Sequence, residues 1–264
     1  MSIKGIIKRI KPIYSFIHIL RRWINSYRLS RLESNGYICG LLGRKALFYM
    51  PFIKTDEIQK GIFTSWKYYE NDYLDYLCDK WHGGVIRKTL KNATILDVGS
   101  NIGNHTLYFL LERGANVAYC FEPAKETFDI LKKNIEINNL VDRTHLYNVG
   151  VGSSSGTACI SLNRDKNTAY TQISLQDGGD VRVLSIDELG IKEKVGFIKI
   201  DVEGFELEVI KGMIKTLEKD KPAMMIEIWT KNLNEIHSIL DPMGYQFDLM
   251  DDRGYQSDYI CYVN

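Results

Sequence analysis

The sequence lacks the cysteine pairs that mark a disulfide framework or a structural zinc site. Its 264 residues include five cysteines, which are odd in number, widely spaced and without a C-x-x-C pair. They are Cys39, Cys78, Cys120, Cys159 and Cys261. Scattered thiols of this kind are typical of a reducing compartment, so we expect a cytoplasmic protein.

Long hydrophobic runs are also missing. No stretch approaches the roughly 20 apolar residues that span a bilayer. Residues 13–20, IYSFIHIL, follow a basic start as a signal-peptide core does, but they include tyrosine, serine and histidine and precede no small-residue cleavage site. The sequence has no internal repeat or low-complexity segment, and it therefore indicates a globular protein.

The chain has almost no net charge, because 34 Lys and Arg residues balance 33 Asp and Glu residues to give +1. This balance gives no argument for a nucleic-acid partner, and we expect none. The basic residues are unevenly placed, however. Eight of them fall between residues 4 and 31, and the first acidic residue is Glu33.

Residues 1–35 space their apolar side chains as an amphipathic helix does, with an interruption near Pro12. The apolar positions are Ile3, Ile6, Ile7, Ile10, Ile13, Ile17, Leu20, Ile24 and Tyr27. Such a basic amphipathic helix suits an anionic membrane surface, here the inner face of the membrane. It equally suits packing on the core or on a second subunit of a homo-oligomer, and the sequence leaves these alternatives open.

The rest of the chain predicts an α/β protein. Residues 37–53 predict a hairpin that turns near Gly43 and Arg44, and residues 69–80 predict a helix. From residue 92, strand patterns alternate with helix patterns over residues 104–113, 124–138, 205–217 and 233–240. The strand patterns are ATILDV, VAYCF, THLYNVGV, TACISL, VRVLSI, GFIKID and AMMIEI, followed by YQFDLM and YICYVN at the end.

This alternation predicts a doubly wound, mostly parallel sheet with an antiparallel edge, which is a Rossmann-like fold. We expect three regions: a basic arm over 1–35, a hairpin and helix over 36–90, and a ligand-binding domain over 91–264. In such a sheet, ligands bind beyond the carboxyl ends of the strands.

The first of these strand ends carries a glycine turn, LDVGSNIGNHT, with Asp97 at the strand tip and Gly99 and Gly103 in the turn. The turn lacks the middle glycine of G-x-G-x-x-G, which argues against a nicotinamide dinucleotide. The second strand ends in FEP, and Glu122 lies 122 − 99 = 23 residues after Gly99, close to the offset of about 20 at which an acid binds a ribose diol. The alternatives are a surface glutamate, a turn-capping Asp97 and a Gly103 needed only for packing.

Several motifs occur together in a characteristic order: YE at residues 69–70, ILDVGSNIGNHT, FEP, LKKNIEINNL, NVGVG, SIDEL, FIKIDVEGFELEVIKG and PAMMIEI. With them, the chain resembles the FkbM-type branch of the S-adenosylmethionine-dependent methyltransferases over about two-thirds of its length. Ser100 stands where the family commonly has alanine, and Gly150 replaces another common alanine. Neither departure removes a charge.

The resemblance implies a class I methyltransferase fold and S-adenosylmethionine as cofactor. The residues implied for the methionine end are Asp97, Gly99, Ser100, Asn101 and Gly103. Glu122, followed by Pro123, is implied for the ribose hydroxyls, and Val149 and Gly150 for the adenine. A carboxylate for the ribose, a close backbone turn and no phosphate grip suit this sulfonium cofactor.

Methyl transfer to oxygen also needs a group that accepts the hydroxyl proton. Asp201 and Glu203 in FIKIDVEGFE are the leading candidates, ahead of His105 and Glu227. One acid here is expected to cap a helix, and Glu206 and Glu208 are expected to be solvated charges on the helix face. A divalent metal at Asp201 and Glu203 would suit their oxygen atoms, but the sequence shows no complete ligand set.

The family resemblance further implies that the acceptor is a hydroxyl of a sugar in a surface polysaccharide or glycolipid precursor. It also implies that residues 36–90 cover the active site, with Tyr69 and Glu70 near its mouth. Two alternatives are a small secondary metabolite as acceptor and a non-catalytic scaffold of a polysaccharide-synthesis complex. The scaffold is disfavoured because a decayed site has no reason to keep Asp97, Gly99, Gly103 and Glu122.

Overall fold

The computed structural model describes residues 37–161, 172–175 and 179–264. The predicted amphipathic helix over 1–35 lies outside the described residues. Within them, no helix combines the length and the hydrophobicity needed to cross a membrane.

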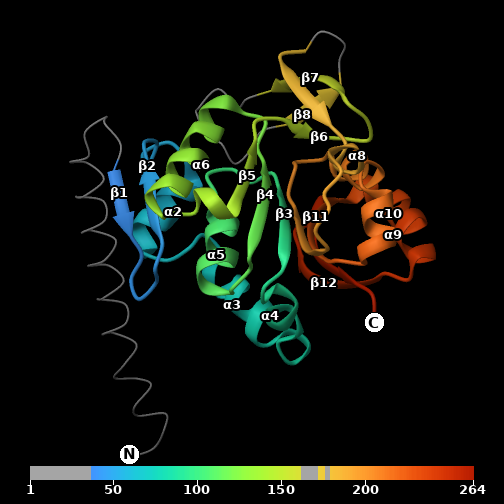
Figure 1. Ribbon diagram of the computed structural model, residues 1–264, viewed down its shortest axis with the longest axis horizontal. Coiled ribbons are helices and arrows are strands. Elements are labelled where there is room, and N and C mark those ends of the chain that lie inside the picture. The colour runs from blue at the N-terminus through green and yellow to red at the C-terminus, as the bar shows by residue number, and fades with distance from the viewer. Residues whose placement is uncertain (1–36, 162–171, 176–178) are drawn as a thin grey trace, which may run out of the picture.

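A seven-stranded sheet forms the centre of the molecule (Figure 1), and its strands follow the order β12-β13-β11-β10-β3-β4-β5. The strands are β3 (Thr94–Val98), β4 (Val117–Phe121), β5 (Thr144–Tyr147), β10 (Val195–Ile200), β11 (Ala223–Trp229), β12 (Gln246–Asp252) and β13 (Gln256–Tyr262). The five strands from β5 to β11 are parallel, whereas β13 runs antiparallel to both β11 and β12. The predicted fold class, with its antiparallel edge, is confirmed.

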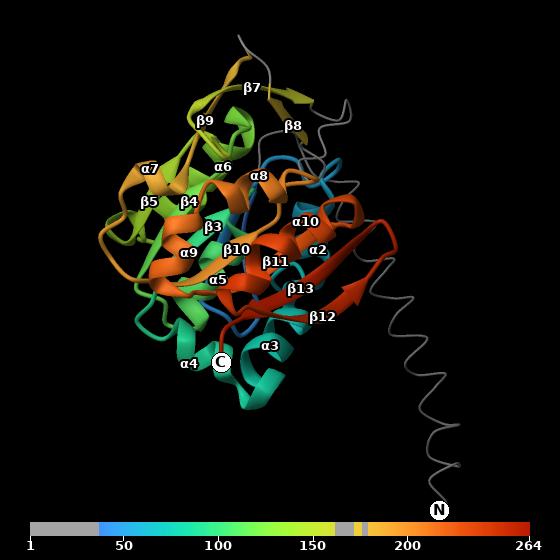
Figure 2. The ribbon, with the colours of Figure 1, turned by 90° about the vertical axis from the view of Figure 1, so that its right-hand side faces the viewer.

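Both faces of the sheet are buried, which explains the nearly continuous apolar strands. All five residues of β3 are buried, and because side chains alternate along a strand, Ile95 joins one hydrophobic core while Leu96 joins the other. The helices α8 (Glu206–Lys211), α9 (Ile214–Asp220) and α10 (Leu233–Leu240) cover the Leu96 face (Figure 2). The opposite face packs on α3 (Asn71–Asp79), α4 (Val85–Leu90), α5 (Asn104–Glu112) and α6 (Lys125–Ile137).

The region predicted to be one helix over 205–217 is two helices, α8 and α9. The chain breaks at Gly212, whose carbonyl accepts hydrogen bonds from the Ser185 hydroxyl (2.8 Å) and from the Asp187 amide (3.0 Å). A side chain at Gly212 would also come within 1.9 Å of the Gly152 carbonyl oxygen. Close packing of a neighbouring loop therefore ends the helix, which periodicity alone does not reveal.

The predicted strand THLYNVGV is likewise two strands that belong to different sheets. It divides at Asn148, whose side-chain amide donates to the carbonyls of Glu122 (2.9 Å) and Pro123 (3.0 Å). The second piece, β6 (Gly150–Val151), joins β7 (Gly156–Ser161), β8 (Gln172–Leu175) and β9 (Val181–Leu184) in a separate sheet of order β6-β9-β7-β8. The sequence analysis did not predict this small sheet, nor α2 (Glu57–Ser65), α4 or the short helix α7 (Ile186–Leu189).

The predicted hairpin is present as β1 (Tyr37–Gly40) and β2 (Leu47–Met50), and the predicted helix over 69–80 is α3.

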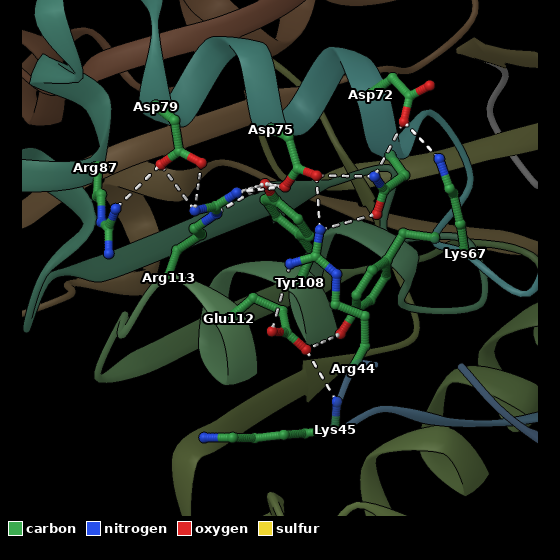
Figure 3. A network of polar contacts seen from close by, with 12 residues as sticks. Arg44, Lys45, Lys67, Asp72, Asp75, Asp79, Arg87, Tyr108, Glu112 and Arg113 are labelled. Carbon is green, nitrogen blue, oxygen red and sulfur yellow. Dashed lines mark hydrogen bonds and ion pairs between the residues drawn. The ribbon is translucent and has the colours of Figure 1, made fainter. Parts of the chain in front are cut away.

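A polar network connects these elements to α5 (Figure 3). Arg113, only 6% exposed, pairs with Asp75 and with Asp79 (2.9 Å), and Asp75 also binds Arg44 (2.6 Å) and the Tyr108 hydroxyl (2.8 Å). Residues 41–90 and the sheet share one hydrophobic core. The three-region division itself stays a prediction.

Candidate active site

A cleft of about 380 Å³ lies at the carboxyl ends of the parallel strands, where the sequence predicts the site. Ten of the twelve predicted site residues line it: Gly99, Ser100, Asn101, His105, Glu122, Pro123, Val149, Gly150, Asp201 and Glu203. Tyr69 and Glu70, which precede α3, and Glu227 from β11 also line it. Segments far apart in the sequence therefore meet at one cleft.

The glycine turn after β3 packs directly on the loop after β10. Gly99 has a φ of 77°, and a Cβ atom there would lie 1.8 Å from the Asp201 carbonyl oxygen. The Ser100 hydroxyl donates to the Asp97 carbonyl (2.6 Å) and accepts from the Phe121 amide (3.0 Å). A glycine is thus required by the contact between two loops, in addition to any close approach of a ligand.

Asp97 and Gly103 lie behind the wall of this cleft. The Asp97 carboxylate is fully buried, accepts from the Thr106 hydroxyl and lies 3.6 Å from the Lys199 amine. Gly103 has a φ of 89°, and a Cβ atom there would come within 2.8 Å of Leu131. The left-handed backbone and the close contact with Leu131 of α6 both favour glycine at position 103, and the Asp97 carbonyl accepts the hydroxyl of Ser100 within the turn.

Glu122, at the end of β4, is 5% exposed and has a defined set of partners. One carboxylate oxygen accepts from the Asn101 amide (3.0 Å) and the other from the Ala124 amide (2.9 Å). Burial raises the pKa of Glu122 to about 7, although these backbone donors oppose the shift. Because each carboxylate oxygen accepts about two hydrogen bonds, one acceptor position per oxygen remains for a pair of hydroxyls. The alternative of a surface glutamate is wrong.

The other end of the cleft gathers carboxylates. Oxygen atoms of Asp201, Glu203 and Glu227 all lie within 4.8 Å of one another. Burial and the nearby Asp201 raise the pKa of Glu203 to about 7, and burial together with Asp201 and Glu203 raises the pKa of Glu227 to about 8. Some of these carboxyl groups are therefore protonated near neutral pH. Those that are ionised can accept a proton or bind a cation.

The loop that carries Glu203 is held by Glu206, which corrects one prediction. Glu206 is fully buried rather than solvated: it accepts from the Gly204 amide (2.6 Å) and from the Asn232 side chain (2.7 Å). These bonds support a left-handed backbone at Glu203, with a φ of 50°.

The prediction for Glu208 was partly right, because this half-buried side chain pairs with Lys211 on the helix face. Asp201 makes no cap on α8 and instead lies 3.3 Å from the Lys199 amine.

His105 is also buried, with 10% of its side chain exposed. Among the described residues, its Nε2 atom has no hydrogen-bond partner, and the Glu70 carboxylate lies 3.6 Å away. Both Glu70 and His105 face the cleft and a smaller cavity that adjoins it.

Lys199 is a functional residue that sequence reasoning missed. Its side chain, 2% exposed, donates to the Gly99 carbonyl (2.6 Å) and lies close to Asp97 and Asp201. Burial opposes its charge, but Asp201 and Asp97 outweigh burial and raise the pKa of the amine. A lysine inside the apolar strand VGFIKI was the available signal.

Asn104 also lines the cleft, and the sequence analysis did not identify it as a site residue. Its side chain binds the Tyr69 backbone in both directions, accepting from the amide (2.9 Å) and donating to the carbonyl (3.1 Å). These two bonds fix the segment that carries Tyr69 and Glu70 against the glycine turn.

Comparison with known proteins agrees with this arrangement. The family model described as the methyltransferase FkbM domain matches residues 97–255. The hexuronic acid methyltransferase AglP of Haloferax volcanii is 33% identical over 165 residues, which cover 60% of this chain and 63% of that protein. The methyltransferase sdnD of Sordaria araneosa is 25% identical over 200 residues, covering 61% of this chain and 76% of that protein.

A similar solved structure is that of methyltransferase FkbM from Methylobacillus flagellatus KT. It shares 22% identity and a TM-score of 0.49 with this chain, over 64% of this chain and 43% of the other. The chain spans less than two thirds of the length of AglP and less than half of that crystallised protein.

Proposed function

The chain belongs to the FkbM methyltransferase family, and from this premise we propose that it transfers the methyl group of S-adenosylmethionine to a hydroxyl of a sugar in a surface polysaccharide or glycolipid precursor. The observation that carries the proposal is the buried Glu122 carboxylate beside the glycine turn, with one acceptor position free on each oxygen. Two adjacent ribose hydroxyls match these positions.

In the proposed complex, Gly99, Ser100 and Asn101 hold the methionine end of the cofactor. Val149 and Gly150, where the chain leaves the central sheet, lie beside the adenine. Pro123 lines the cleft next to the ribose-binding Glu122. Asp97 and Gly103 act from behind the wall, by fixing the turn.

The reaction is an in-line displacement. The acceptor oxygen forms a bond to the methyl carbon as the carbon–sulfur bond breaks, and the electron pair of that bond stays on sulfur to give S-adenosylhomocysteine. The hydroxyl proton passes to a nearby base, for which Asp201, Glu203 and His105 are the candidates. All three candidates line the cleft.

Two observations favour a sugar hydroxyl as the acceptor. The cleft wall beyond the proposed methyl group is lined by polar side chains such as Glu70, Glu227 and Arg253, which suit a polyhydroxylated ligand. The relative AglP is by its name a hexuronic acid methyltransferase. A small secondary metabolite is the alternative acceptor.

Calorimetric titration of the full-length protein with S-adenosylhomocysteine and with NAD tests the cofactor. We expect micromolar binding of S-adenosylhomocysteine and none of NAD. Binding of NAD alone would instead indicate an oxidoreductase, and binding of neither would favour a non-catalytic scaffold. Incubation with a labelled methyl donor and a library of surface-glycan fragments, followed by mass spectrometry, then identifies the acceptor.

We also propose that residues 1–31 attach the protein to anionic membrane at the cytoplasmic face, where lipid-linked sugar precursors would be found. The support is the cluster of eight basic residues with no acid among them. The full-length protein should float with anionic liposomes at low salt and be released as salt rises, whereas a chain starting at residue 34 should not float. If truncation changes the oligomeric state instead, the segment packs on a second subunit.

A further inference from the structure

We propose that Asp201, Glu203 and Glu227 bind one divalent cation of the Mg²⁺ or Mn²⁺ type at the acceptor end of the cleft. Its function, to hold the acceptor hydroxyl, rests on the proposed methyl transfer, whereas its binding does not. The site is built by three segments: the tip of β10, the loop that follows it and the middle of β11.

The spacing of the three carboxylates suits one ion. Their oxygen atoms lie within 4.8 Å of one another. Ligands on opposite sides of Mg²⁺ are roughly 4.2 Å apart, and those of Ca²⁺ about 4.6–5.2 Å, because the metal–oxygen distances are half of these values. Small rotations of the side chains would therefore bring all three into one coordination shell. Ligands that are all carboxylates favour such hard cations over zinc or copper.

The positive charges already present leave this set incompletely paired. Lys199 lies beside Asp201, and Arg253 binds one oxygen of Glu227 (2.7 Å). The other Glu227 oxygen is buried and, within the described part of the chain, has no hydrogen-bond partner. Glu203 has neither a hydrogen bond nor an ion pair through its carboxylate to any residue that the structure describes. These oxygen atoms without protein partners are therefore the ones available to a cation.

A second and independent feature faces the same place. The His105 side chain is nine-tenths buried, and no described residue lies within hydrogen-bond distance of its Nε2 atom. His105 lines the small cavity that Asp201, Glu227 and Glu70 also line. A buried ring nitrogen without a hydrogen-bond partner, on a side chain that lines a cavity walled by carboxylates, is expected to meet a ligand there. We assign it to the acceptor hydroxyl, whose proton it can take.

The proposed cation would also determine which acceptors can bind. Glu70, Asp201, Glu203 and Glu227 line the cleft, and Arg253 and Lys199 are the cations beside them in the described structure. Without a divalent ion, this end would repel an acceptor that carries a carboxylate, and with one it would attract that acceptor. Removal of the ion should therefore weaken the binding of an acidic sugar more than that of a neutral sugar.

Titration of the full-length protein with Mn²⁺, followed by electron paramagnetic resonance, tests the site without any need for turnover. We expect one saturable Mn²⁺ per chain, displaced by excess Mg²⁺. Residues that merely orient metal ligands contribute 10–100-fold to affinity, so Glu203→Gln and Glu227→Gln should each weaken Mn²⁺ binding at least about tenfold. Glu126→Gln, on the exposed first turn of α6, should leave it unchanged.

S-adenosylhomocysteine affinity, measured on the same samples, shows that each variant is folded and separates the two proposals. Cofactor binding without saturable Mn²⁺ binding would overturn the metal site and leave the methyltransferase proposal standing. Mn²⁺ binding without cofactor binding would overturn the methyltransferase proposal and leave the metal site standing. Unchanged Mn²⁺ affinity in Glu203→Gln, with cofactor affinity retained, would also refute this assignment of the ligands.

Discussion

Glu122→Gln probes the cofactor end of the cleft, because it preserves the shape of the side chain and removes its charge. In the wild-type protein, each carboxylate oxygen accepts one backbone N–H and keeps one position for a ribose hydroxyl. The amide group of glutamine replaces one acceptor with a donor, so one backbone N–H loses its acceptor and one ribose hydroxyl can no longer donate to the side chain. Hydrogen bonds to a charged group contribute about 1.5–3 kcal/mol, which corresponds to roughly 10- to 100-fold weaker binding of S-adenosylhomocysteine.

The pH dependence of this difference makes the test specific. Since burial raises the pKa of Glu122 to about 7, the wild-type carboxyl is mostly protonated at pH 5.5 and mostly ionised at pH 8.5. The wild-type affinity should therefore rise with pH through about 7, while the affinity of Glu122→Gln should not. Calorimetry from pH 5.5 to 8.5 should show the ratio of the two affinities growing from a few-fold to its full value.

The stability of the wild-type protein without cofactor should fall as the pH rises, whereas its affinity for the cofactor should increase. An acid whose pKa is 4.5 unfolded and about 7 folded binds its proton more tightly in the folded state. It therefore favours folding below pH 4.5 and loses that contribution as pH rises to 7, in total about 3 kcal/mol for a shift of about 2.5 units. Glutamine does not titrate, so the stability of Glu122→Gln relative to wild type should improve by about that amount between pH 4.5 and 8.5.

Urea denaturation at both pH values measures this change, with Glu126→Gln as the matched control on an exposed site. A cofactor affinity that is equal in wild type and Glu122→Gln at pH 8.5 would refute the placement of the ribose. A difference in affinity that does not vary with pH would refute the raised pKa of the buried carboxyl.

Three further substitutions test the framework of the cleft. Gly99→Ala should destabilise the protein by about 3 kcal/mol in urea denaturation, because its Cβ atom would overlap a carbonyl oxygen, whereas Gly114→Ala, with a φ of 76° but open space, should cost about 1 kcal/mol. Arg113→Met should cost about 1.5–3 kcal/mol because it removes a buried guanidinium and its charge-assisted hydrogen bonds to Asp75 and Asp79, and Arg87→Met, at an exposed ion pair, at most about 1 kcal/mol in the same assay. Asn104→Ala should raise KM for the acceptor more than the Kd for S-adenosylhomocysteine in steady-state kinetics and calorimetry, since it frees the segment before α3.

The central sheet and its site were predictable because local patterns coincide with tertiary demands. Strands that are buried on both faces appear in the sequence as apolar runs. Because parallel strands place their carboxyl ends at one edge of the sheet, Gly99, Glu122 and Asp201 could be predicted to lie close together. The missed elements lack such a pattern. The helix α2 begins where the Asp56 side chain accepts the Gln59 amide (2.8 Å), a signal confined to a few residues.

Predictions failed where a distant segment determines the local structure. Gly212 ends a helix because its carbonyl accepts a hydrogen bond from the Ser185 hydroxyl. Asn148 divides a strand because its side-chain amide donates to the Glu122 carbonyl in the loop after β4. Glu206 was expected to be solvated because glutamate on a helix face usually is, yet it is buried and accepts a hydrogen bond from the Asn232 side chain, 26 residues away. In each case the partner lies far away in the sequence or outside the periodic pattern, so no window of residues contains the information.

Lys199 links the two ends of the cleft, and this explains why neither end can be understood separately. Its buried amine donates to the Gly99 carbonyl (2.6 Å), in the glycine turn proposed to hold the cofactor, and lies 3.3 Å from the Asp201 carboxylate at the proposed acceptor end. The Asp97 carboxylate, which the sequence assigned to the cofactor, lies 3.6 Å from the same amine and helps to keep it charged. An isolated buried ammonium is costly, so the positions of these three groups determine one another. Asp97 thus shapes the acceptor end through Lys199, although its own side chain lies behind the wall of the cleft.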